Sequence, residues 1–522
     1  KINQKLNSIT RSRKKISNQI RNYAKTQFYK KLNSSEKFNF TWLRLIIIVY
    51  PEVIYPLVYH FYKQGFLLRA YKELKFCPSM TPKVSLLRER IEEMLYILRN
   101  KQFPNLGTKK TISVQFNQRI LFALHNSLPH DGAGYALRSH AILTFLSRQK
   151  IEVLAATRLD YPWDLNKHAA QPRYLKNQID GISYLRLTGE KVTYGRVKDS
   201  IYVEHYANKL VSLARHHQAS IIHSASNFLN GLAAIRAARE LGIWSVYEVR
   251  GLWHLSRASK EANFDQTDLY RYQEIMEQIA VREADAVIVI SEALRDELRS
   301  WGIDKNKISV IPNAVDLSRF SSQKPDLELK QSLGLQDCFV IGFLGSLTAY
   351  EGLDLLIKAV SNLLDQGKPI GLVIVGDGQI KEQLEAMAKT TSKPDRIIFT
   401  GRVPFEEVNK YYSIFDLCPL PRKSYEVCKR VPPLKILEIL AMGKPTIVSN
   451  LPPLLEIIED HKTGRVCQAD SIENLQEVIL EVYNHPETTQ RLSQAGRTWV
   501  EKNRSWEIIS QEILKVYEKL GE

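Results

Sequence analysis

The segment from Arg422 to Ser449 holds the densest set of side chains that can bind an anionic ligand. Lys435 and Glu438 are three residues apart, so both fall on one face of the helix that the Pro432–Pro433 pair is expected to begin. A cation at that point suits a diphosphate, and a glutamate can accept two hydroxyl hydrogen bonds, as a ribose diol requires. The loop before the helix supplies four more cations, which are Arg422, Lys423, Lys429 and Arg430. The alternative is an exposed Lys435–Glu438 helix pair, worth only about 0.3 kcal/mol.

Three glycine-containing loops are expected beside the same ligand, because each follows a short apolar run that is typical of a buried strand. They are residues 130–135, with Gly132 and Gly134, residues 345–347, with Gly345 and Ser346, and residues 376–378, with Gly376. Glycine lets backbone N–H groups approach a ligand closely, and a helix N-terminus favours a phosphate. Each loop alone is equally well explained as ordinary turn chemistry. None has the GxGxxG or GxxxxGKS/T pattern, which argues against hydride transfer and ATP hydrolysis.

The elements that must position these residues form two successive series of buried strands and helices. After Arg119, apolar runs alternate with amphipathic stretches such as Tyr135–Arg148, a pattern typical of a parallel sheet covered on both faces. The first series of expected strands is 120–124, 152–156, 220–223, 244–248 and 286–290. The second begins near Val310 and continues with 340–344, 372–375, 397–400, 417–420 and 446–449. Two doubly wound α/β domains are therefore predicted, with the ligand in the cleft between them.

The excess of positive charge is confined to the N-terminal part of the chain. The 522 residues include 73 Lys+Arg and 56 Asp+Glu, a net charge of +17, and residues 1–110 alone hold 23 and 6 of these. Residues 111–522 therefore carry 50 of each sign. A nucleic-acid-binding body would carry the basic excess itself, so we expect a neutral body with a basic appendage and no nucleic-acid partner.

The cysteines and the start of the chain bear on its compartment. Five cysteines without CxxC spacing predict neither a disulfide framework nor a zinc site, and they indicate a reducing, cytosolic compartment; they are Cys77, Cys338, Cys418, Cys428 and Cys467. No secretory signal opens the chain. The first residue is Lys1 rather than Met, so the native N-terminus can lie upstream of it, and a removed targeting segment is one alternative.

The basic appendage has two interpretations. Residues 1–31 carry ten Lys/Arg and no acid, with a heptad seam from Ile2 to Gln27. They predict either a parallel coiled coil, which would make a homo-oligomer, or a basic amphipathic helix on an anionic membrane. The apolar run from Trp42 to Tyr62 is interrupted by charges and by Pro51 and Pro56, which disfavours a spanning helix. It predicts either kinked helices packed on the body or shallow membrane insertion.

As a set, the motifs between Arg119 and Tyr517 resemble the retaining, nucleotide-sugar-dependent glycosyltransferases of GT-B fold, family 4. They occur in the family's order, as GAGYALRSHAI, TRLDYPWD, HSASNFLNGLAA, VYEVRGLW, ADAVIVISEALRDEL, VIPNAVD, IGFLGSLTAYEGLDLLIKA, VIVGDG, FTGRVP, PPLKILEILAMGKPTIVS and HKTG. Through YEVRGLW, AYEG and PPLKILE the chain is most similar to a bacterial branch associated with surface-polysaccharide synthesis.

The resemblance implies a role for each matching residue. Glu438 corresponds to the second glutamate of the family's E-x7-E motif and would hold the donor ribose. Gly345 would lie by the diphosphate, and the backbone of Arg402 and Val403 would border the base. Gly132 and Gly134 would form the loop that closes on the donor. The implied donor-binding set is Glu438, Gly345, Ser346, Gly376, Arg402, Val403, Gly132 and Gly134.

The departures from the family pattern concern charge. Arg430 stands where the family has the first glutamate, and Ser346 and Glu351 stand where it has an Arg and a Lys. We therefore expect Arg430 and Lys435 to supply the cations for the diphosphate from the other side. The family's imidazole has no direct match, since its candidate positions are Ala225 and Arg250. Glu248 and Arg250 either line the acceptor side or form a structural ion pair at a strand end.

The resemblance implies transfer of a hexosyl group from a nucleoside-diphosphate sugar to a hydroxyl acceptor, a glycan or lipid-linked glycan, with retention. No Asp-x-Asp motif lies near the site, so we expect no metal and no cofactor beyond the nucleotide sugar as co-substrate. A GT-B nucleotide-sugar epimerase and a catalytically idle GT-B scaffold are the alternatives. The expected location is cytoplasmic and peripheral, on the inner face of the plasma membrane.

Four parts are expected along the chain. Residues 1–35 would form the basic coiled coil or amphipathic helix, and residues 36–115 a helical extension. Residues 116–308, joined by a C-terminal helix at 505–522, would form a Rossmann-like acceptor-side domain. Residues 309–504 would form a second Rossmann-like domain that binds the nucleotide sugar.

Overall fold

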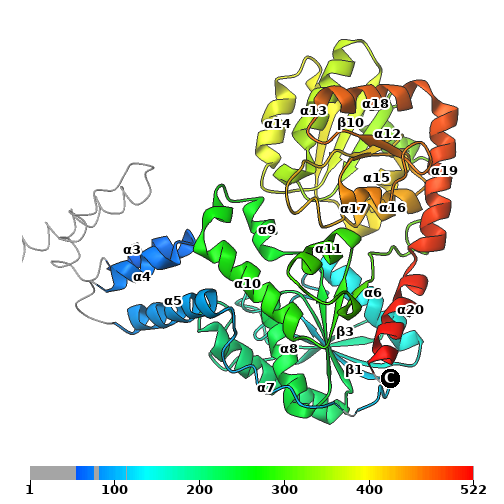
Figure 1. The fold of residues 1–522 in the computed structure, drawn as a ribbon. Coiled ribbons are helices and arrows are strands. Elements are labelled where there is room, and N and C mark those ends of the chain that lie inside the picture. The colour runs from blue at the N-terminus through cyan, green and yellow to red at the C-terminus, as the bar shows by residue number, and fades with distance from the viewer. Residues whose placement is uncertain (1–53, 76–80, 113, 521–522) are drawn as a thin grey trace, which may run out of the picture. The chain divides into compact units, whose positions relative to one another are not determined.

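The computed structural model describes residues 54–75, 81–112 and 114–520, and it divides into two compact units. The smaller unit takes the described residues up to Asn105 together with 192–202 and 261–279, and the larger takes 106–191, 203–260 and 280–520. The proposed coiled coil of residues 1–35 lies outside the described residues. The helices that begin the chain in Figure 1 are α3 (Ile54–Lys63), α4 (Leu67–Leu74) and α5 (Pro82–Asn100).

The smaller unit is held together by apolar helix faces and a few polar contacts. Helix α5 begins with Pro82 after the N-cap Thr81, whose hydroxyl accepts a hydrogen bond from the Val84 N–H. Its buried face is Val84, Leu87, Ile91, Met94 and Ile97. The later segments are tied in by the Leu68 N–H, which donates to Asp268 at 2.9 Å, and by the Ser200 N–H, which donates to Glu93 at 3.0 Å. Within the described residues, every helix is too short or too polar to cross a bilayer.

The larger unit begins with an eight-stranded sheet in the order β3-β4-β2-β1-β5-β6-β7-β8. All neighbouring strands are parallel except β3 and β4. Strands such as β5 and β7 are buried along their whole length, as expected where helices cover both faces of a parallel sheet. The strands are β1 (Arg119–Leu124), β2 (Glu152–Thr157), β3 (Lys176–Ile179), β4 (Ile182–Leu185), β5 (Ile221–Ala225), β6 (Trp244–Val249), β7 (Ala286–Val289) and β8 (Ile308–Val310).

This sheet corrects two sequence-based expectations. The β3–β4 hairpin was not predicted, although Asp180 and Gly181, both with positive φ, form the Asp-Gly turn that favours such a hairpin. Residues 308–310 do not begin the second series, because β8 pairs with β7 at the edge of the first sheet. The first half of the body therefore carries a mixed sheet that ends at the linker after Val310.

The second half of the larger unit is a parallel layer made of two three-stranded sheets, β11-β10-β9 and β12-β13-β14. The two sheets meet at β9 and β12, where the Gly342 N–H donates to the Leu417 carbonyl at 2.8 Å. The strands are β9 (Phe339–Leu344), β10 (Ile370–Val375), β11 (Ile397–Gly401), β12 (Cys418–Leu420), β13 (Thr446–Ser449) and β14 (Arg465–Cys467). Apart from β14, each was expected from the sequence.

Helices connect the strands in both halves (Figure 1). The first half has α6 (Gly134–Arg148), most of α7 (Asp199–His217), α8 (Phe228–Leu241), α9 (Trp253–Ala258) and α11 (Glu292–Ser300), whereas most of α10 (Asp268–Glu283) lies in the smaller unit. The second has α12 (Leu327–Ser332), α13 (Leu353–Asp365), α14 (Lys381–Lys389), α15 (Val408–Ile414), α16 (Lys435–Ala441), α17 (Pro452–Leu455), α18 (Ile472–Asn484) and α19 (Pro486–Asn503). Short 3-10 turns are η2 (Phe264–Gln266), η3 (Lys305–Lys307), η4 (Ala349–Glu351), η5 (Pro394–Arg396) and η6 (Phe405–Glu407).

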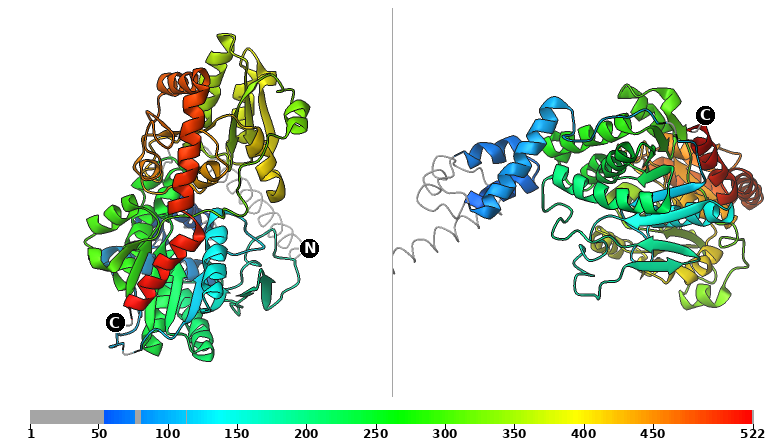
Figure 2. Two further views of the ribbon diagram at one scale, coloured as in Figure 1. Left: turned by 90° about the vertical axis from the view of Figure 1, so that its right-hand side faces the viewer. Right: turned by 90° about the horizontal axis from the view of Figure 1, so that it is seen from below.

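The last helix, α20 (Trp506–Lys519), returns to the first half of the body. It packs on α6, and Ile513 and Tyr517 enter the core of the first sheet. The left view of Figure 2 shows this red helix lying against the first α/β half. The Tyr517 hydroxyl lies 2.6 Å from Nδ1 of His223 on β5, although 294 positions separate the two residues. The end of the chain is thus anchored by a buried polar contact as well as by apolar packing.

Replacing Tyr517 with Phe tests this anchor. The variant keeps the buried ring but leaves the His223 Nδ1 atom without its partner, so we expect stability to fall by about 1–3 kcal/mol, measured by chemical denaturation. Tyr96, which is 47% exposed, provides the control, because Tyr96→Phe should leave stability unchanged. Equal stability of the Tyr517 variant and the unaltered protein would contradict the anchoring role.

Candidate functional site

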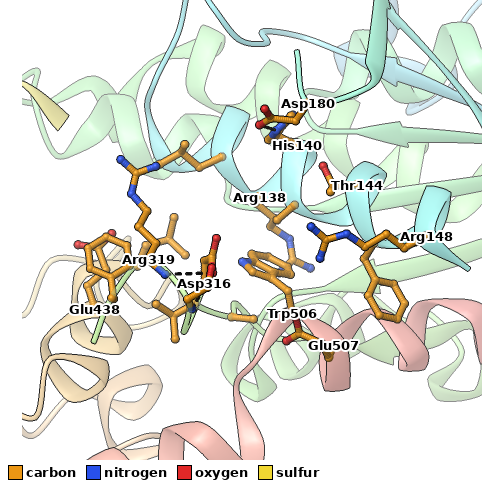
Figure 3. A pocket seen from close by; sticks show the side chains of 18 residues that line it. Arg138, His140, Thr144, Arg148, Asp180, Asp316, Arg319, Glu438, Trp506 and Glu507 are labelled. Atoms are coloured by element: carbon orange, nitrogen blue, oxygen red, sulfur yellow. Dashed lines mark hydrogen bonds and ion pairs between the residues drawn. The ribbon is translucent and has the colours of Figure 1, made fainter. Parts of the chain in front are cut away.

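A cavity of about 490 Å³ opens between the two α/β halves of the larger unit. Five segments line it, and Figure 3 shows their side chains turned toward one space. Its charged and polar lining includes Arg138, His140, Thr144 and Arg148 of α6, Asp180 of the hairpin turn, Asp316 and Arg319 of the linker, Glu438 of α16, and Glu507 of α20. The cavity is thus lined by helices, the hairpin turn and the linker, and no residue of the three glycine loops lines it.

Glu438 is the predicted ribose-binding residue, and it lines this cavity. Its Oε2 atom accepts a hydrogen bond from the Tyr412 hydroxyl at 3.0 Å. Burial raises the pKa of Glu438, while the Tyr412 hydrogen bond and the charges of Lys435 and Arg319 act in the opposite direction. The alternative of an exposed Lys435–Glu438 helix pair is not what the fold uses, because each side chain has a different buried partner.

Two glycine loops cross beside the start of α16. Gly345 has φ +149°, and its N–H donates to the Val375 carbonyl at 2.9 Å. Gly376 has φ +141°, and a Cβ atom there would lie 1.9 Å from the Gly345 carbonyl oxygen. Any side chain at Gly376 would therefore collide with the neighbouring loop, which explains the glycine in physical terms.

A buried charge cluster lies directly against Gly345. The Lys435 ammonium is 3.1 Å from Oε2 of Glu351 and 4.1 Å from the centre of the Phe343 ring. A Cβ atom on Gly345 would lie only 2.6 Å from the same ammonium. The Arg422 guanidinium approaches the other oxygen of Glu351, at 3.7 Å, and one of its terminal nitrogens donates to the Val431 carbonyl at 2.9 Å. One carboxylate is thus held between two cations.

The pKa values of the cluster reflect burial opposed by charge. Burial alone would raise the pKa of Glu351, but the charges of Lys435 and Arg422 outweigh it and leave that pKa lowered. Burial lowers the pKa of Lys435, and Glu351 opposes the shift. Lys435 Nζ and Glu351 Oε2 pair with each other, whereas the buried Arg422 Nε atom, 3.7 Å from Glu351, finds no hydrogen-bond partner among the described residues.

Arg430 does not join this cluster. Its guanidinium donates to Glu297 of α11 at 2.7 Å and to Glu426 at 2.6 Å, while its carbonyl accepts a hydrogen bond from Ser291. The expectation that Arg430 and Lys435 face one ligand is therefore not what the geometry shows, because two carboxylates already neutralise Arg430. Arg422 stands beside Lys435 instead. The helix also begins at Lys435 rather than at the Pro432–Pro433 pair.

The remaining predicted donor residues surround this region without lining the cavity. A Cβ atom on Gly134, the first residue of α6, would lie 2.5 Å from Leu434, so the first glycine loop touches the residue before Lys435. Gly132 and Ser346 are exposed, and Val403 is half-buried. The Arg402 side chain is 81% exposed, 3.7 Å from Asp377. Among the described residues, no cluster of His, Cys, Asp or Glu is arranged to hold a metal ion.

Glu248 and Arg250 belong to a second buried charge cluster, in the first half. Oε1 of Glu248 accepts a hydrogen bond from Arg138 Nε at 2.8 Å, and Oε2 accepts one from Arg250 Nε at 2.8 Å. The Glu248 side chain is 0% exposed. Burial would raise the pKa of Glu248, but the charges of Arg250 and Arg138 hold it well below its ordinary value. This geometry favours the structural ion pair over contact with a substrate.

Sequence reasoning missed Arg138 and Arg422 as site residues. Arg138 lies in the GAGYALRSHAI motif, donates to the linker carbonyls of Ile311 and Pro312 at 2.8 and 2.7 Å, and lines the cavity. Arg422 was noticed as one of four loop cations, but nothing in the sequence distinguished it from Arg430. A cation directly after a strand end was the available signal for Arg422, which follows β12, whereas Arg138 lies inside α6 and carried no comparable signal.

The comparisons with known proteins agree with this architecture. Residues 146–319 match the family model Glycosyltransferase Family 4, and residues 326–499 match Glycosyl transferases group 1. The chain is 27% identical over 228 residues to a GDP-mannose-dependent alpha-(1-6)-phosphatidylinositol monomannoside mannosyltransferase of Mycolicibacterium smegmatis, covering 43% of this chain and 59% of that relative. Across the first curated relatives the matched segment spans about three fifths of their own length.

Solved structures show the same fold. Sucrose-phosphate synthase of Thermosynechococcus elongatus superposes with a TM-score of 0.63 at 19% identity, covering 77% of this chain and 99% of that one. Anabaena Alr3699/HepE in complex with UDP-glucose gives a TM-score of 0.59 at 18% identity, with 77% and 99% coverage. The two adjoining family matches and these superpositions show that the chain contains two segments similar to glycosyltransferase families and has the fold of these solved structures.

Replacing Glu248 with Gln tests the structural role of the second cluster. The change leaves two buried arginines without their counter-ion, and we expect a loss of about 3–5 kcal/mol in unfolding free energy. Because folding lowers the pKa of Glu248 from its ordinary 4.5, its contribution is present above that pH and is lost as pH falls through the lower folded value. The difference in unfolding free energy between the variant and the unaltered protein should therefore be constant near neutral pH and decrease at acidic pH.

The matched control for that experiment is Glu204→Gln. Glu204 pairs with Arg236 at 2.8 Å, but its side chain is 47% exposed, so the change should cost less than about 1 kcal/mol. Denaturation at several pH values measures both variants. A Glu248 variant as stable as this control would show that the cluster does not hold the fold together.

Proposed function

We propose that the chain transfers a hexosyl group from a nucleoside-diphosphate sugar to a hydroxyl group of a glycan or lipid-linked glycan, with retention of anomeric configuration and without a metal. The observation that carries the proposal is the placement of α16. Its first residue, Lys435, lies against the Gly345 loop, and one turn later Glu438 lines the cavity between the halves. A cation for a diphosphate and a carboxylate for a ribose diol are thereby fixed on one rigid helix.

The chemistry requires charge stabilisation at the leaving group. The bond between the anomeric carbon and the phosphate oxygen breaks, and a bond forms from the acceptor oxygen to the same face of the sugar. Lys435 and Arg422 would stabilise the negative charge that develops on the diphosphate, so that no metal is required. The leaving phosphate oxygen takes the acceptor proton. Retention is an implication of the family resemblance.

The two halves have separate tasks in this account. The second half, with the Gly345 and Gly376 loops, Glu438 and the backbone near Arg402 and Val403, binds the donor. The first half contributes Gly132 and Gly134 at the mouth of the cleft and presents the acceptor. Closure of the cleft would exclude water and so limit hydrolysis of the donor.

An idle GT-B scaffold is the second candidate, and the state of Arg430 favours it. The residue replaces a glutamate of the family motif and is bound to Glu297 and Glu426, so no carboxylate is offered at that position. A protein of this kind would retain the fold and lose transfer. Measured turnover separates the two candidates, and incubation with donor alone reveals an epimerase by its product.

We place the enzyme at the inner face of the plasma membrane, held there by its smaller unit. Helix α4 exposes Leu68 beside three cations, Arg69, Lys72 and Lys75, and Phe66 before it is 41% exposed. Cations next to large apolar side chains are the chemistry that an anionic bilayer binds. A lipid-linked acceptor would be found at such a surface. Self-association through residues 1–35 is the alternative, and that segment lies outside the described residues.

Alanine substitution of Lys435 tests the proposed donor site. A thermal-shift panel of nucleotide sugars first identifies the donor, since a ligand at 100 times its Kd stabilises by about 2.7 kcal/mol. In the transfer assay with that donor, Lys435→Ala should lower kcat about 100-fold or more, because a preorganised cation is lost at the leaving group. Arg430→Ala should cost less than about tenfold, since its charge is already neutralised.

Lys429→Ala is the control for that assay, because Lys429 lies in the same loop but is 41% exposed and pairs with Glu426. It should leave turnover unchanged. Absence of binding across the whole nucleotide panel would favour the idle scaffold. Near-normal turnover of Lys435→Ala would remove Lys435 from the site.

Charge reversal on α4 tests the membrane assignment. The triple change of Arg69, Lys72 and Lys75 to Glu should abolish co-flotation with phosphatidylglycerol vesicles, since each cation near an anionic surface contributes about 1 kcal/mol. A control reverses three exposed lysines of the larger unit, Lys389, Lys393 and Lys502. The control should still float. Equal flotation of both variants would show that α4 is not the docking surface.

A further inference from the structure

Glu351 is a buried carboxylate between two cations, as Glu248 is in the first half. Its side chain is 6% exposed, and the two cations beside it, Lys435 and Arg422, are 13% and 5% exposed. One negative charge therefore faces two positive charges in a desolvated place, which leaves the cluster with a net positive charge. A buried net charge is costly unless another group neutralises it. The cluster is thus electrostatically suited to an additional anion.

The hydrogen bonding of this cluster is incomplete. In the cluster around Glu248, both carboxylate oxygens accept hydrogen bonds from arginines. In the cluster around Glu351, Lys435 pairs with the carboxylate at 3.1 Å, but Arg422 Nε is 3.7 Å from it and finds no hydrogen-bond partner in the described part of the chain. Native proteins rarely leave buried polar atoms unpaired, and an unpaired guanidinium nitrogen is a group that an anionic ligand can satisfy.

The position of the cluster fits such a ligand. The Lys435 ammonium occupies the space that a side chain at Gly345 would fill, so it lies directly against the backbone of that loop. Gly352, which follows Glu351, has φ +72°, and a Cβ atom there would lie 1.9 Å from the Pro421 carbonyl oxygen. The loop that carries Glu351 is therefore fixed against the residue before Arg422. Glu351 cannot move far, whereas the longer Lys435 side chain can turn toward a ligand.

We propose that Glu351 is an internal competitor for the diphosphate: it pairs with Lys435 and Arg422 in the unliganded protein and yields Lys435 to the phosphate when the donor binds. This inference rests on the proposed function. It predicts a preference between ligands of different charge. The diphosphate of a sugar nucleotide carries about two negative charges, and the free nucleoside diphosphate carries close to three at neutral pH. A fixed carboxylate at the site repels the product more strongly than the donor and so promotes product release.

The test compares Glu351→Gln with the unaltered protein in calorimetric titrations. The probes are UDP, GDP and ADP, the sugar nucleotide of whichever base binds, and inorganic pyrophosphate. Removing the competing charge should increase the affinity for the nucleoside diphosphate about tenfold and the affinity for the sugar nucleotide by a smaller factor. The affinity for pyrophosphate should increase in the same way as the affinity for the nucleoside diphosphate. The control Glu501→Gln removes an ion pair with Arg497 on α19, at 2.8 Å, and should leave the affinity for every probe unchanged.

A second variant distinguishes a change in affinity from a loss of folding. Glu351→Gln leaves two buried cations unpaired and is expected to melt at a lower temperature without ligand. The double variant Glu351→Gln with Arg422→Gln restores the original net charge and should return the nucleoside diphosphate affinity toward that of the unaltered protein. Circular dichroism confirms that each variant is folded before titration.

The outcomes separate this inference from the proposed function. Equal affinities of the Glu351 variant and the unaltered protein for a nucleoside diphosphate would overturn the competitor role while leaving the donor site in place. Tighter pyrophosphate binding by the variant, with no nucleotide bound by either protein, would support the anion site and overturn the proposed function. If neither protein binds any probe, both fail. Weaker binding by the folded variant would show that Glu351 assists the ligand, which also overturns the competitor role.

Discussion

The structure depends on how buried charge is compensated between its layers. In each α/β half, one buried carboxylate lies between two cations near the carboxyl ends of parallel strands. Because an isolated buried charge costs several kcal/mol, each trio must either satisfy itself or be satisfied by a ligand. Both oxygens of Glu248 accept hydrogen bonds from arginines at 2.8 Å, whereas Glu351 is 3.1 Å from Lys435 and 3.7 Å from Arg422, whose Nε atom has no hydrogen-bond partner among the described residues. From that difference we propose a structural role for the first trio and a role in binding for the second.

The self-satisfied trio positions the cleft. Arg138 joins Glu248 to the linker carbonyls of Ile311 and Pro312, so the buried pair holds α6 and the linker between the halves in one arrangement. The first residue of α6 is Gly134, which touches Leu434 just before Lys435. The structural cluster of one half therefore fixes the glycine loop that adjoins the binding cluster of the other. Electrostatics, rather than a single motif, links the two halves at the site.

The sequence predicted the parts of this fold whose signal is local. Most strands and α6 follow from apolar runs and helical periodicity, which depend only on neighbouring residues. The Asp180-Gly181 hairpin was equally local and was overlooked. What the sequence did not determine is which cation meets which carboxylate. Arg430 and Arg422 lie in one loop, and only the folded path shows that Glu297, from another element, pairs with the first while Glu351 faces the second.

The central claim is that Lys435 and Arg422, held by Glu351 in the unliganded protein, form the phosphate-binding part of the site. A crystal structure with the nucleoside diphosphate that stabilises the protein most tests it directly. The account predicts a phosphate oxygen about 3 Å from the Lys435 ammonium, and a separation between Lys435 Nζ and Glu351 Oε2 greater than the present 3.1 Å. A complex in which Lys435 remains on Glu351 while the phosphates contact Arg430 or other groups would contradict it.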